Sequence, residues 1–398
     1  MFNKNYKLKP IDKSLFLKEN AVNHLLKYPT PTNLSYAWGF GSLAAVCLVI
    51  QLLSGIFLNM YYVPHSDHAF ASVEYIMREV NYGWFIRYCH TTGASFFFII
   101  TYAHIARSIY YKSYQGRMFL WFSGIIILVL LMATAFMGYV LPWGQMSLWG
   151  ATVITGMFSS IPVLGDYIVV WIWGGMNVSG LTLHRFLTLH YVFGFLLAGM
   201  VILHLVLLHE VGSNQPFKVE YYNEKDSFYP NFINKDVLGI IIFLVAFAFV
   251  AYFYPNIFNH PDNYVKSNPM VTPLHIVPEW YFLPFYAALR AIDDKLLGLV
   301  YMFGLIITLA LMPYCDESPL KNPQERPLFR VMFWIWIAIW FLLGYLGSQA
   351  LIDPYVWWHK PALIFYYSYV VIFSYVCSDF EIEVIEKNKT INQKKDNA

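Results

Sequence analysis

The segment HTTGASFFFIITYAH at residues 90–104 begins and ends with histidine, and the segment HYVFGFLLAGMVILH at residues 190–204 does the same. His90 and His104 are therefore 14 residues apart, as are His190 and His204. In an α-helix, 14 residues make almost four turns and rise about 14 × 1.5 Å, or ~21 Å. Each pair of histidines thus lies on one face of its helix. The spacing predicts two levels, with His90 opposite His190 and His104 opposite His204.

The chain around these segments has the composition of a membrane protein. Of its 398 residues, 58% are hydrophobic and 13% are charged, against roughly 25% charged in soluble domains. We expect an all-α membrane protein with eight transmembrane helices, the first four forming a four-helix bundle that carries the two histidine levels. The expected spans are 36–62, 84–110, 118–140, 184–208, 236–255, 296–314, 329–350 and 358–378. Seven or nine spans remain the alternative.

Shorter apolar stretches between the spans predict interfacial helices. They lie near 145–156, 164–175 and 278–290, and are too short to cross a bilayer. Around them we divide the chain into a polar N-terminal arm (1–33), the bundle (34–211), a C-terminal four-span region (212–380) and a charged tail (381–398). With eight spans, most of the 26 Lys and Arg residues fall on the side of the two chain ends. That side is expected to face the negatively charged compartment, which places the interfacial helices on the positive side.

Charge and cysteine content exclude several kinds of site. The net charge of +2 gives no electrostatic reason to expect a nucleic-acid partner. The four cysteines form no C-x-x-C or C-x-x-C-H motif. Iron–sulfur, zinc-thiolate and covalent haem sites are therefore not expected.

Two matched imidazole pairs without neighbouring carboxylates or thiolates favour two haem irons, each with both axial ligands from the protein. One buried histidine alone is more often a hydrogen-bonded packing residue, but two pairs at equal spacing favour ligation. Glycines recur at the same interval in the first and third spans, as Gly41 with Gly55 and Gly124 with Gly138. They would leave room for a flat macrocycle, although glycine is also common at helix contacts in membranes.

Two arginines lie one helical turn from the histidines, each toward its own membrane surface. Arg87 precedes His90 by three residues and Arg107 follows His104 by three. Both are placed to pair with haem propionates, because arginine–carboxylate pairing is strong and directional. Snorkelling of long side chains to the membrane surface is the alternative explanation.

Several motifs give the chain a family resemblance. They are RYCHTTGAS at 87–95, GYVLPWGQMSLWGATVIT at 138–155, IWGG at 172–175, LHEVGSNQP at 208–216, KDVLG at 235–239 and PEWYF at 278–282. With them, residues 28–380 resemble cytochrome b of the cytochrome bc complex, the quinol–cytochrome c oxidoreductase of respiratory chains. Two features depart from the family pattern. Asp293 and Asp294 follow Ile292 where proline and a small or amide residue are usual, and His184 replaces a small polar residue.

The resemblance implies a Q cycle with two non-covalent b-type haems. Ubiquinol would be oxidised on the intermembrane side and quinone reduced on the matrix side, with electrons crossing the membrane through the haems and protons translocated. The implied partners are the Rieske iron–sulfur subunit, a membrane-anchored c-type cytochrome subunit and other complex III subunits, in a dimeric complex embedded in lipid. The implied location is the mitochondrial inner membrane, with both termini in the matrix.

Candidate quinone-site residues lie at both ends of the spans. His209, Ser213, Lys235 and Asp236 lie at the negative-side ends of the fourth and fifth spans, where they could hydrogen-bond quinone and deliver protons. They could equally be ordinary polar residues at helix ends.

On the positive side, Glu279 is expected to accept a proton from quinol. Its alternative role is that of a helix N-terminal charge after Pro278. Tyr281, Tyr286 and Tyr139 could position the quinol ring.

Two other classes of protein stay open at this point. One is a di-haem anchor that carries electrons for a peripheral dehydrogenase without an energy-coupling quinol site. The acidic stretch at 278–286 and the helices near 145–175 disfavour this class, since they suggest a second quinone pocket. The other is a transporter in which the histidines relay protons, which would show no haem band in a redox difference spectrum.

Overall fold

The computed structural model describes residues 27–215 and 225–396. Most of the predicted N-terminal arm therefore lies outside the described residues, as does the segment 216–224, which begins with the last residue of the motif at 208–216. Within the described residues the fold is all-α apart from two short strands, β1 (Pro29–Pro31) and β2 (Lys225–Ser227), which pair antiparallel. This ribbon joins the beginning of the described chain to the connection between α8 and α9.

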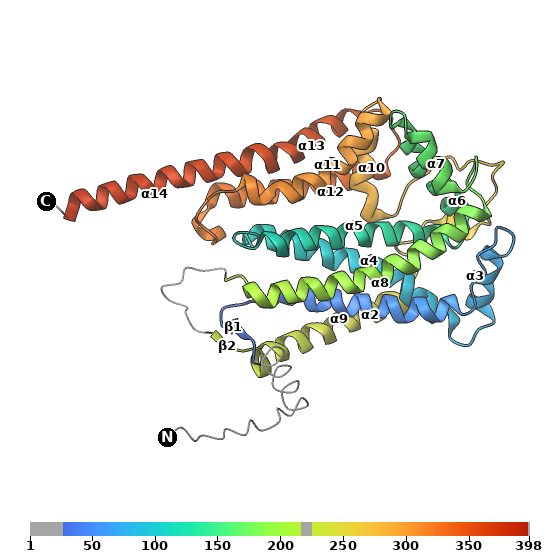
Figure 1. The fold of residues 1–398 in the computed structure, drawn as a ribbon, viewed down its shortest axis with the longest axis horizontal. Coiled ribbons are helices and arrows are strands. Elements are labelled where there is room, and N and C mark those ends of the chain that lie inside the picture. Colours follow the sequence, from blue (N-terminus) through green and yellow to red (C-terminus); the bar gives the residue numbers. More distant parts are fainter. Residues whose placement is uncertain (1–26, 216–224, 397–398) are drawn as a thin grey trace, which may run out of the picture.

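Long helices lie side by side and form the body of the molecule (Figure 1). They are α2 (Phe40–Asn59), α4 (Gly83–Tyr110), α5 (Met118–Val140), α8 (Gly180–Val211), α9 (Ile233–Phe253), α11 (Lys295–Cys315), α12 (Pro327–Ser348) and the continuous α13 (Val356–Ser368), η7 (Tyr369–Phe373) and α14 (Ser374–Asp396). The 3-10 turn η1 (Tyr36–Gly39) leads into α2. These helices match the eight predicted spans, with boundaries shifted by a few residues at most ends. The all-α membrane fold is confirmed.

Seven of these helical segments in the described chain are long and apolar enough to cross a membrane by length and composition. The eighth long helix, α4, is less apolar because it carries histidine, threonine and serine along its length. Its 28 residues rise about 42 Å, more than a hydrocarbon core of roughly 30 Å requires. Helices α2, α3 and α9 pack against α4 and cover part of its surface.

Short helices gather at one end of the bundle, which we call the α6–α7 end (Figure 1). They are α3 (Ala69–Arg78), α6 (Gln145–Gly156), η2 (Met157–Ser160), α7 (Gly165–Trp173), η4 (Pro261–Tyr264), η5 (Trp280–Phe282) and α10 (Leu283–Arg290). The helices expected near 145–156, 164–175 and 278–290 are present. Helix α3 was missed because its ten residues are too few and too polar to stand out as a hydrophobic run.

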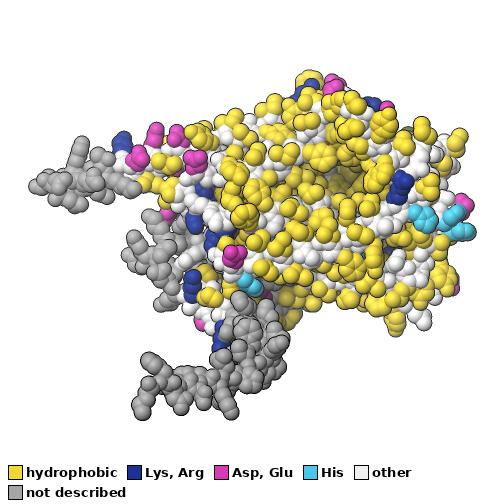
Figure 2. Space-filling model, in the orientation of Figure 1, with side chains coloured by type: hydrophobic (Ala, Val, Ile, Leu, Met, Phe, Trp, Pro, Cys, Tyr) yellow, Lys and Arg dark blue, Asp and Glu magenta, His cyan; other side chains and the backbone are white. Residues whose placement is uncertain are grey.

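The opposite end, which we call the β1–β2 end, holds the two strands, η3 (Phe228–Phe232), η6 (Pro323–Glu325) and the end of α14. Helix α14 continues through 381–396, so the charged tail prolongs the last span as a helix. Figure 2 shows apolar side chains over the middle of one face, with charged side chains mainly toward its two ends. That distribution is expected for a protein whose middle contacts lipid tails.

Packing divides the helices into two groups. In the first, α2 packs on α4 and α5 packs on α8. In the second, α10, α11, α12 and α13 pack around one another. A buried apolar cluster joins the groups, because residues of α4 and α5 such as Ile109 and Leu128 lie in one core with Leu305, Phe333 and Tyr366.

Candidate functional site

His90 on α4 and His190 on α8 face each other inside the first group of helices. Their ring centres are 6.2 Å apart and their planes are inclined by 76°. Two imidazoles that share one metal atom, with metal–nitrogen bonds of about 2.0–2.1 Å as for zinc, have ring centres roughly 6 Å apart. Both rings line a cavity of ≈ 250 Å³. The separation therefore fits axial ligation of one metal by both residues.

Hydrogen bonds fix the proton positions on three of the four imidazoles. His190 Nδ1 lies 2.7 Å from the Thr134 carbonyl oxygen, which can only accept, so Nδ1 carries the hydrogen. Ser54 Oγ lies 2.9 Å from His90 Nδ1, and its own hydrogen is donated to the Ile50 carbonyl. Ser54 must therefore accept from Nδ1–H of His90.

The same arrangement holds at the second level. Ser123 Oγ is 2.7 Å from His204 Nδ1 and donates its hydrogen to the Leu120 carbonyl. A histidine whose Nδ1–H is donated in this way has a lone pair free on Nε2, through which it can bind a metal. In His90, His190 and His204, groups on neighbouring helices thus leave Nε2 free to bind a metal.

Each of the four glycines lies against one of the four histidines. A Cβ added at Gly55 would be 3.1 Å from Cε1 of His90, and one at Gly138 only 2.5 Å from Cε1 of His190. The corresponding distances are 3.6 Å from Gly41 to His104 and 3.4 Å from Gly124 to His204. In the structure, the glycines make room for the edges of the imidazoles, which gives a direct reason for their matching 14-residue interval.

Arg107 is buried beside His104, with Nη2 3.3 Å from the histidine Nδ1. Its guanidinium carbon lies 5.1 Å from the Trp38 ring centre, and its Nε has no hydrogen-bond partner among the described residues. Within that part of the chain Arg107 forms no ion pair. Such an unpaired buried cation fits an anionic group such as a propionate. An arginine that donates to Nδ1 of His104 would shift the imidazole hydrogen to Nε2, so ligation by His104 requires Arg107 to turn toward its anion.

No group of three or more His, Cys, Asp or Glu side chains converges in the described part of the chain. One pair of imidazoles, His90 and His190, does converge. A metal with only two protein ligands on opposite sides fits an iron whose remaining ligands belong to a macrocycle.

The cavity beside His90 and His190 also reaches Glu279 and Tyr139. A second cavity of ≈ 20 Å³, about the size needed for one water molecule, lies between α5, α6 and α10 and is lined by Glu279, Tyr139 and Tyr286. Glu279 thus stands on the wall shared by two cavities. Its Oε1 and the Tyr139 hydroxyl are buried without a hydrogen-bond partner among the described residues.

Burial raises the pKa of Glu279 from its usual value to about 7, because the charged form loses water. The neighbouring Tyr139 phenol lowers the pKa of Glu279, but by a smaller amount than burial raises it. A carboxyl group with a pKa near neutrality can both accept and release protons at physiological pH.

The neighbouring tyrosines have separate environments. Tyr281 is buried and stacks on Phe98, with ring centres 3.9 Å apart. Tyr286 donates to the Ile276 carbonyl at 3.1 Å and lies under Arg290, whose guanidinium carbon is 4.2 Å from its ring centre. Arg87 also lines the larger cavity, with its guanidinium 5.4 Å from the Tyr264 ring.

At the β1–β2 end, the four polar residues singled out in the sequence lie on α8, α9 and the loop after α8. Asp236 Oδ2 accepts from Ser42 at 2.6 Å, and Lys235 Nζ donates to the Leu34 carbonyl at 3.2 Å. His209 packs against Tyr28, with ring centres 4.6 Å apart. The carbonyl of Ser213 accepts from Arg117.

The two departures from the family pattern have simple structural settings. Asp294 caps α11, with its side chain accepting from Leu297 N–H at 2.7 Å. Such a cap stabilises a helix start, which explains why an aspartate is accommodated there. His184 lies exposed on α8 and is not one of the residues that line the cavity.

The residues that orient the imidazoles were missed in the sequence, but two of them leave a signal. Ser54 and Ser123 each precede one of the singled-out glycines, Gly55 and Gly124, so a Ser-Gly pair recurs in spans one and three. Thr134 acts through its backbone, which leaves no trace in the sequence.

Two family models match this chain. "Cytochrome b/b6/petB" matches residues 25–212 and "Cytochrome b(C-terminal)/b6/petD" matches residues 266–367. Cytochrome b of Chondrus crispus is 50% identical over 376 residues, covering 93% of this chain and 99% of that protein. Cytochrome b of Phytophthora megasperma is 55% identical over 345 residues, covering 86% and 89%.

A bacterial relative and a solved structure extend the likeness. Cytochrome b of Rickettsia prowazekii is 50% identical and covers 88% of this chain and 89% of its own length. A chain of a hyperthermophilic respiratory Complex III superposes with a TM-score of 0.87 at 34% identity, covering 93% of this chain and 98% of its own.

Proposed function

Because this chain belongs to the cytochrome b family, we propose that it is the cytochrome b subunit of a quinol–cytochrome c oxidoreductase that works by a Q cycle. Membership of the family and the match to a respiratory Complex III chain support a core role in a multi-subunit quinol oxidoreductase of the membrane.

Two b-type haems would be held by His90 with His190 and by His104 with His204. Haem, when bound, supplies one-electron redox chemistry at two levels of the bilayer, about 21 Å apart along the helices. Ser54, Ser123 and the Thr134 carbonyl orient the imidazoles. Arg87 and Arg107 are the proposed partners of the propionates, and Gly41, Gly55, Gly124 and Gly138 admit the imidazole edges.

At the α6–α7 end, Glu279 is the proposed proton acceptor for ubiquinol oxidation. Oxidation of one quinol releases two protons, and a carboxyl group with a pKa of about 7 can take one of them. Its place between two cavities allows a proton to enter from one side and leave by the other. Tyr139, Tyr281 and Tyr286 line or support this pocket and position the quinol ring.

At the β1–β2 end, His209, Ser213, Lys235 and Asp236 are the proposed quinone-reduction residues. They combine hydroxyl, imidazole, ammonium and carboxylate groups, which can hydrogen-bond the two carbonyl oxygens of quinone and supply protons. We place this end in the matrix, with both termini, and the α6–α7 end on the intermembrane side of the mitochondrial inner membrane. The proposed partners are the Rieske iron–sulfur subunit and a membrane-anchored c-type cytochrome subunit in a dimeric complex.

The observation that carries this proposal is the facing pair His90 and His190, with a free Nε2 lone pair on each, beside a cavity that reaches Glu279. The test is a redox difference spectrum of the purified complex, together with quinol and quinone kinetics of an Asp236→Asn variant. We expect two b-type haem signals and, in the variant, slow quinone reduction with normal quinol oxidation. Absence of haem bands would refute the proposal in favour of a transporter, and selective loss of quinol oxidation would show that the two ends are inverted.

A further inference from the structure

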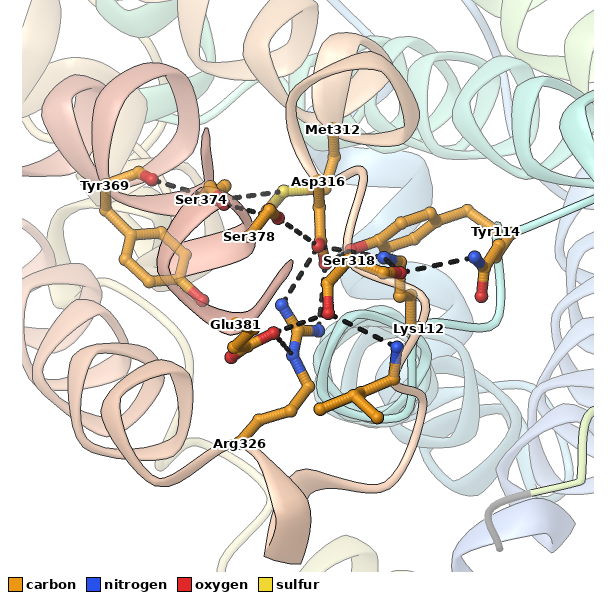
Figure 3. Close-up of polar contacts among 12 residues, drawn as sticks. Lys112, Tyr114, Met312, Asp316, Ser318, Arg326, Tyr369, Ser374, Ser378 and Glu381 are labelled. Atoms are coloured by element: carbon orange, nitrogen blue, oxygen red, sulfur yellow. Dashed lines mark hydrogen bonds and ion pairs between the residues drawn. The ribbon is translucent and has the colours of Figure 1, made fainter. Parts of the chain in front are cut away.

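Four charged side chains are buried together where the α4–α5 loop, the α11–α12 connection and α14 meet (Figure 3). Lys112, Asp316 and Arg326 have 0% exposed side chains and Glu381 has 6%. We call these four residues the charge cluster. Two cations balance two anions, which is the condition under which charges persist in a protein interior.

Asp316 is the hub of the charge cluster. Its Oδ1 accepts from Lys112 Nζ at 2.9 Å, Arg326 Nη2 at 2.9 Å and Ser378 Oγ at 2.8 Å. Its Oδ2 accepts from the Tyr114 hydroxyl at 2.6 Å and from Arg326 Nη1 at 3.0 Å. Burial alone would raise the pKa of Asp316, but Arg326 and Lys112 outweigh burial and lower it. The carboxylate is therefore charged at physiological pH.

Arg326 extends the cluster to the last helix. Its Nε donates to Glu381 Oε2 on α14 at 2.8 Å, and Ser318 donates to the same carboxylate. The positions of α12, α14 and the connection after α11 are thereby tied to one another.

Lys112 ties the α4–α5 loop to this assembly at a cost. Its backbone φ is +49°, in the left-handed region that favours glycine. Its amine is also fully buried and donates to Asp316 and to the Ser318 carbonyl. Lysine is unfavourable at this position because of both its left-handed backbone and the burial of its charge. The contacts of its amine with Asp316 and Ser318 offset these costs.

The same loop also forms hydrogen bonds with residues 212–214, at the end of α8. Arg117 donates to the carbonyls of Gly212 at 3.2 Å and Ser213 at 3.3 Å, and to Asn214 Oδ1 at 3.2 Å. Asn214 in turn donates to the Tyr111 carbonyl at 2.7 Å. The loop 111–117 thus stands between the charge cluster and residues 212–214.

We propose that the charge cluster, through the loop 111–117, positions residues 212–214 at the rim of the quinone-reduction pocket and so sets the affinity of that pocket for quinone. This inference rests on the function proposed above. The four residues of the charge cluster are positioning residues. Lys112 belongs to the loop and Asp316 bonds it, while Arg326 holds Asp316 and is itself held by Glu381. The arrangement couples the α11–α12 connection and α14 to a pocket whose proposed residues lie on α8, on α9 and in the loop after α8.

The test compares two single-residue variants in the assembled complex. Tyr114→Phe removes one hydrogen bond to Asp316 and keeps the ring and every charge. Lys112→Gly removes the amine and places a residue suited to the left-handed backbone. We expect the KM for a short-chain ubiquinone in the reduction half-reaction to rise about two- to tenfold in Tyr114→Phe, the effect of about one lost hydrogen bond. The rise should be larger in Lys112→Gly, which removes the contacts to both Asp316 and the Ser318 carbonyl. The kcat for quinol oxidation at the other pocket should stay at the wild-type value.

Tyr314→Phe is the matched control, because Tyr314 lies two residues from Asp316 but is exposed. It should leave the KM unchanged. An unchanged KM in both variants, an equal loss of both half-reactions, or failure of both variants to assemble would overturn the inference and leave the cluster a purely structural element. A wild-type complex without quinone reduction would instead refute the function itself, whatever the variants do.

Discussion

For a buried histidine, the position of its hydrogen decides which ring nitrogen can bind a metal. Ser54, Ser123 and the Thr134 carbonyl each take the Nδ1 hydrogen of one imidazole and leave Nε2 free. Glu279 is governed by a comparable local effect, because loss of water moves its pKa to about 7. At this scale, chemistry follows from one or two neighbouring groups.

The Glu279→Gln variant should lower the rate of quinol oxidation at least tenfold, and by as much as the roughly 10²–10⁴ that general base catalysis contributes. The carboxylate is the proton-accepting form, so the wild-type rate should rise as pH rises through about 7. The variant should lose this rise and keep both haem spectra. A wild-type rate and pH profile in the assembled variant would reduce Glu279 to a charge at a helix start.

Gly138→Ala should disturb the His190 level, because the new Cβ would lie 2.5 Å from the imidazole Cε1. The ring must turn away, and we expect loss or a strong shift of one haem signal in the redox spectrum. Gly199→Ala on α8 is the control, since a Cβ there meets nothing within 4 Å. Equal spectra for the two variants would show that the close approach has no role.

At the scale of the element, the 14-residue interval works because α4 and α8 are each continuous through both of their histidines. The same interval in α2 and α5 places one glycine against each imidazole. Four helices with a shared period therefore build two equivalent levels, and neither level depends on a loop.

His104→Leu should remove only the haem near the β1–β2 end, because the two levels are about four turns apart. The His90 and His190 level should keep its spectrum and its reduction by quinol. The measurement is a quinol-reduced difference spectrum of the assembled variant. Loss of both haems together would contradict the assignment of residues to levels.

At the scale of the whole molecule, the charge cluster joins elements that are far apart in the sequence. Lys112 and Asp316 are 204 residues apart, and Ser378 and Glu381 come from the last helix. The apolar core shared by α4, α5 and the second group of helices has the same effect. The two halves of the chain therefore form one body.

Asp316→Asn should destabilise the protein by about 3–5 kcal/mol, the cost of removing one charged partner of a buried ion pair and leaving the other unpaired. The measurement is the thermal unfolding midpoint of the solubilised complex. Glu325→Gln is the control, because Glu325 is an exposed carboxylate in the same connection. Since the folded pKa of Asp316 is lowered, its contribution to stability should be present at neutral pH and lost as pH falls below the ordinary aspartate range.

The sequence alone determined the features that repeat along single helices. Runs of apolar residues are long enough to show as spans, and the intervals of histidines and glycines can be counted because α-helical geometry is regular. The expected pairing of His90 with His190 agrees with their facing rings. The assignment of ligands, propionate partners and quinone residues stays a prediction.

Contacts between groups that are far apart in the sequence could be found only from the packing of the helices. The serines beside His90 and His204, the cavity that joins His190 to Glu279, and the pairing of Lys112 with Asp316 all depend on how helices pack. The reason is the distance along the chain over which each feature is determined. Helix periodicity follows from local backbone geometry, whereas a buried hydrogen bond or ion pair is fixed by the packing of elements that are far apart in the chain.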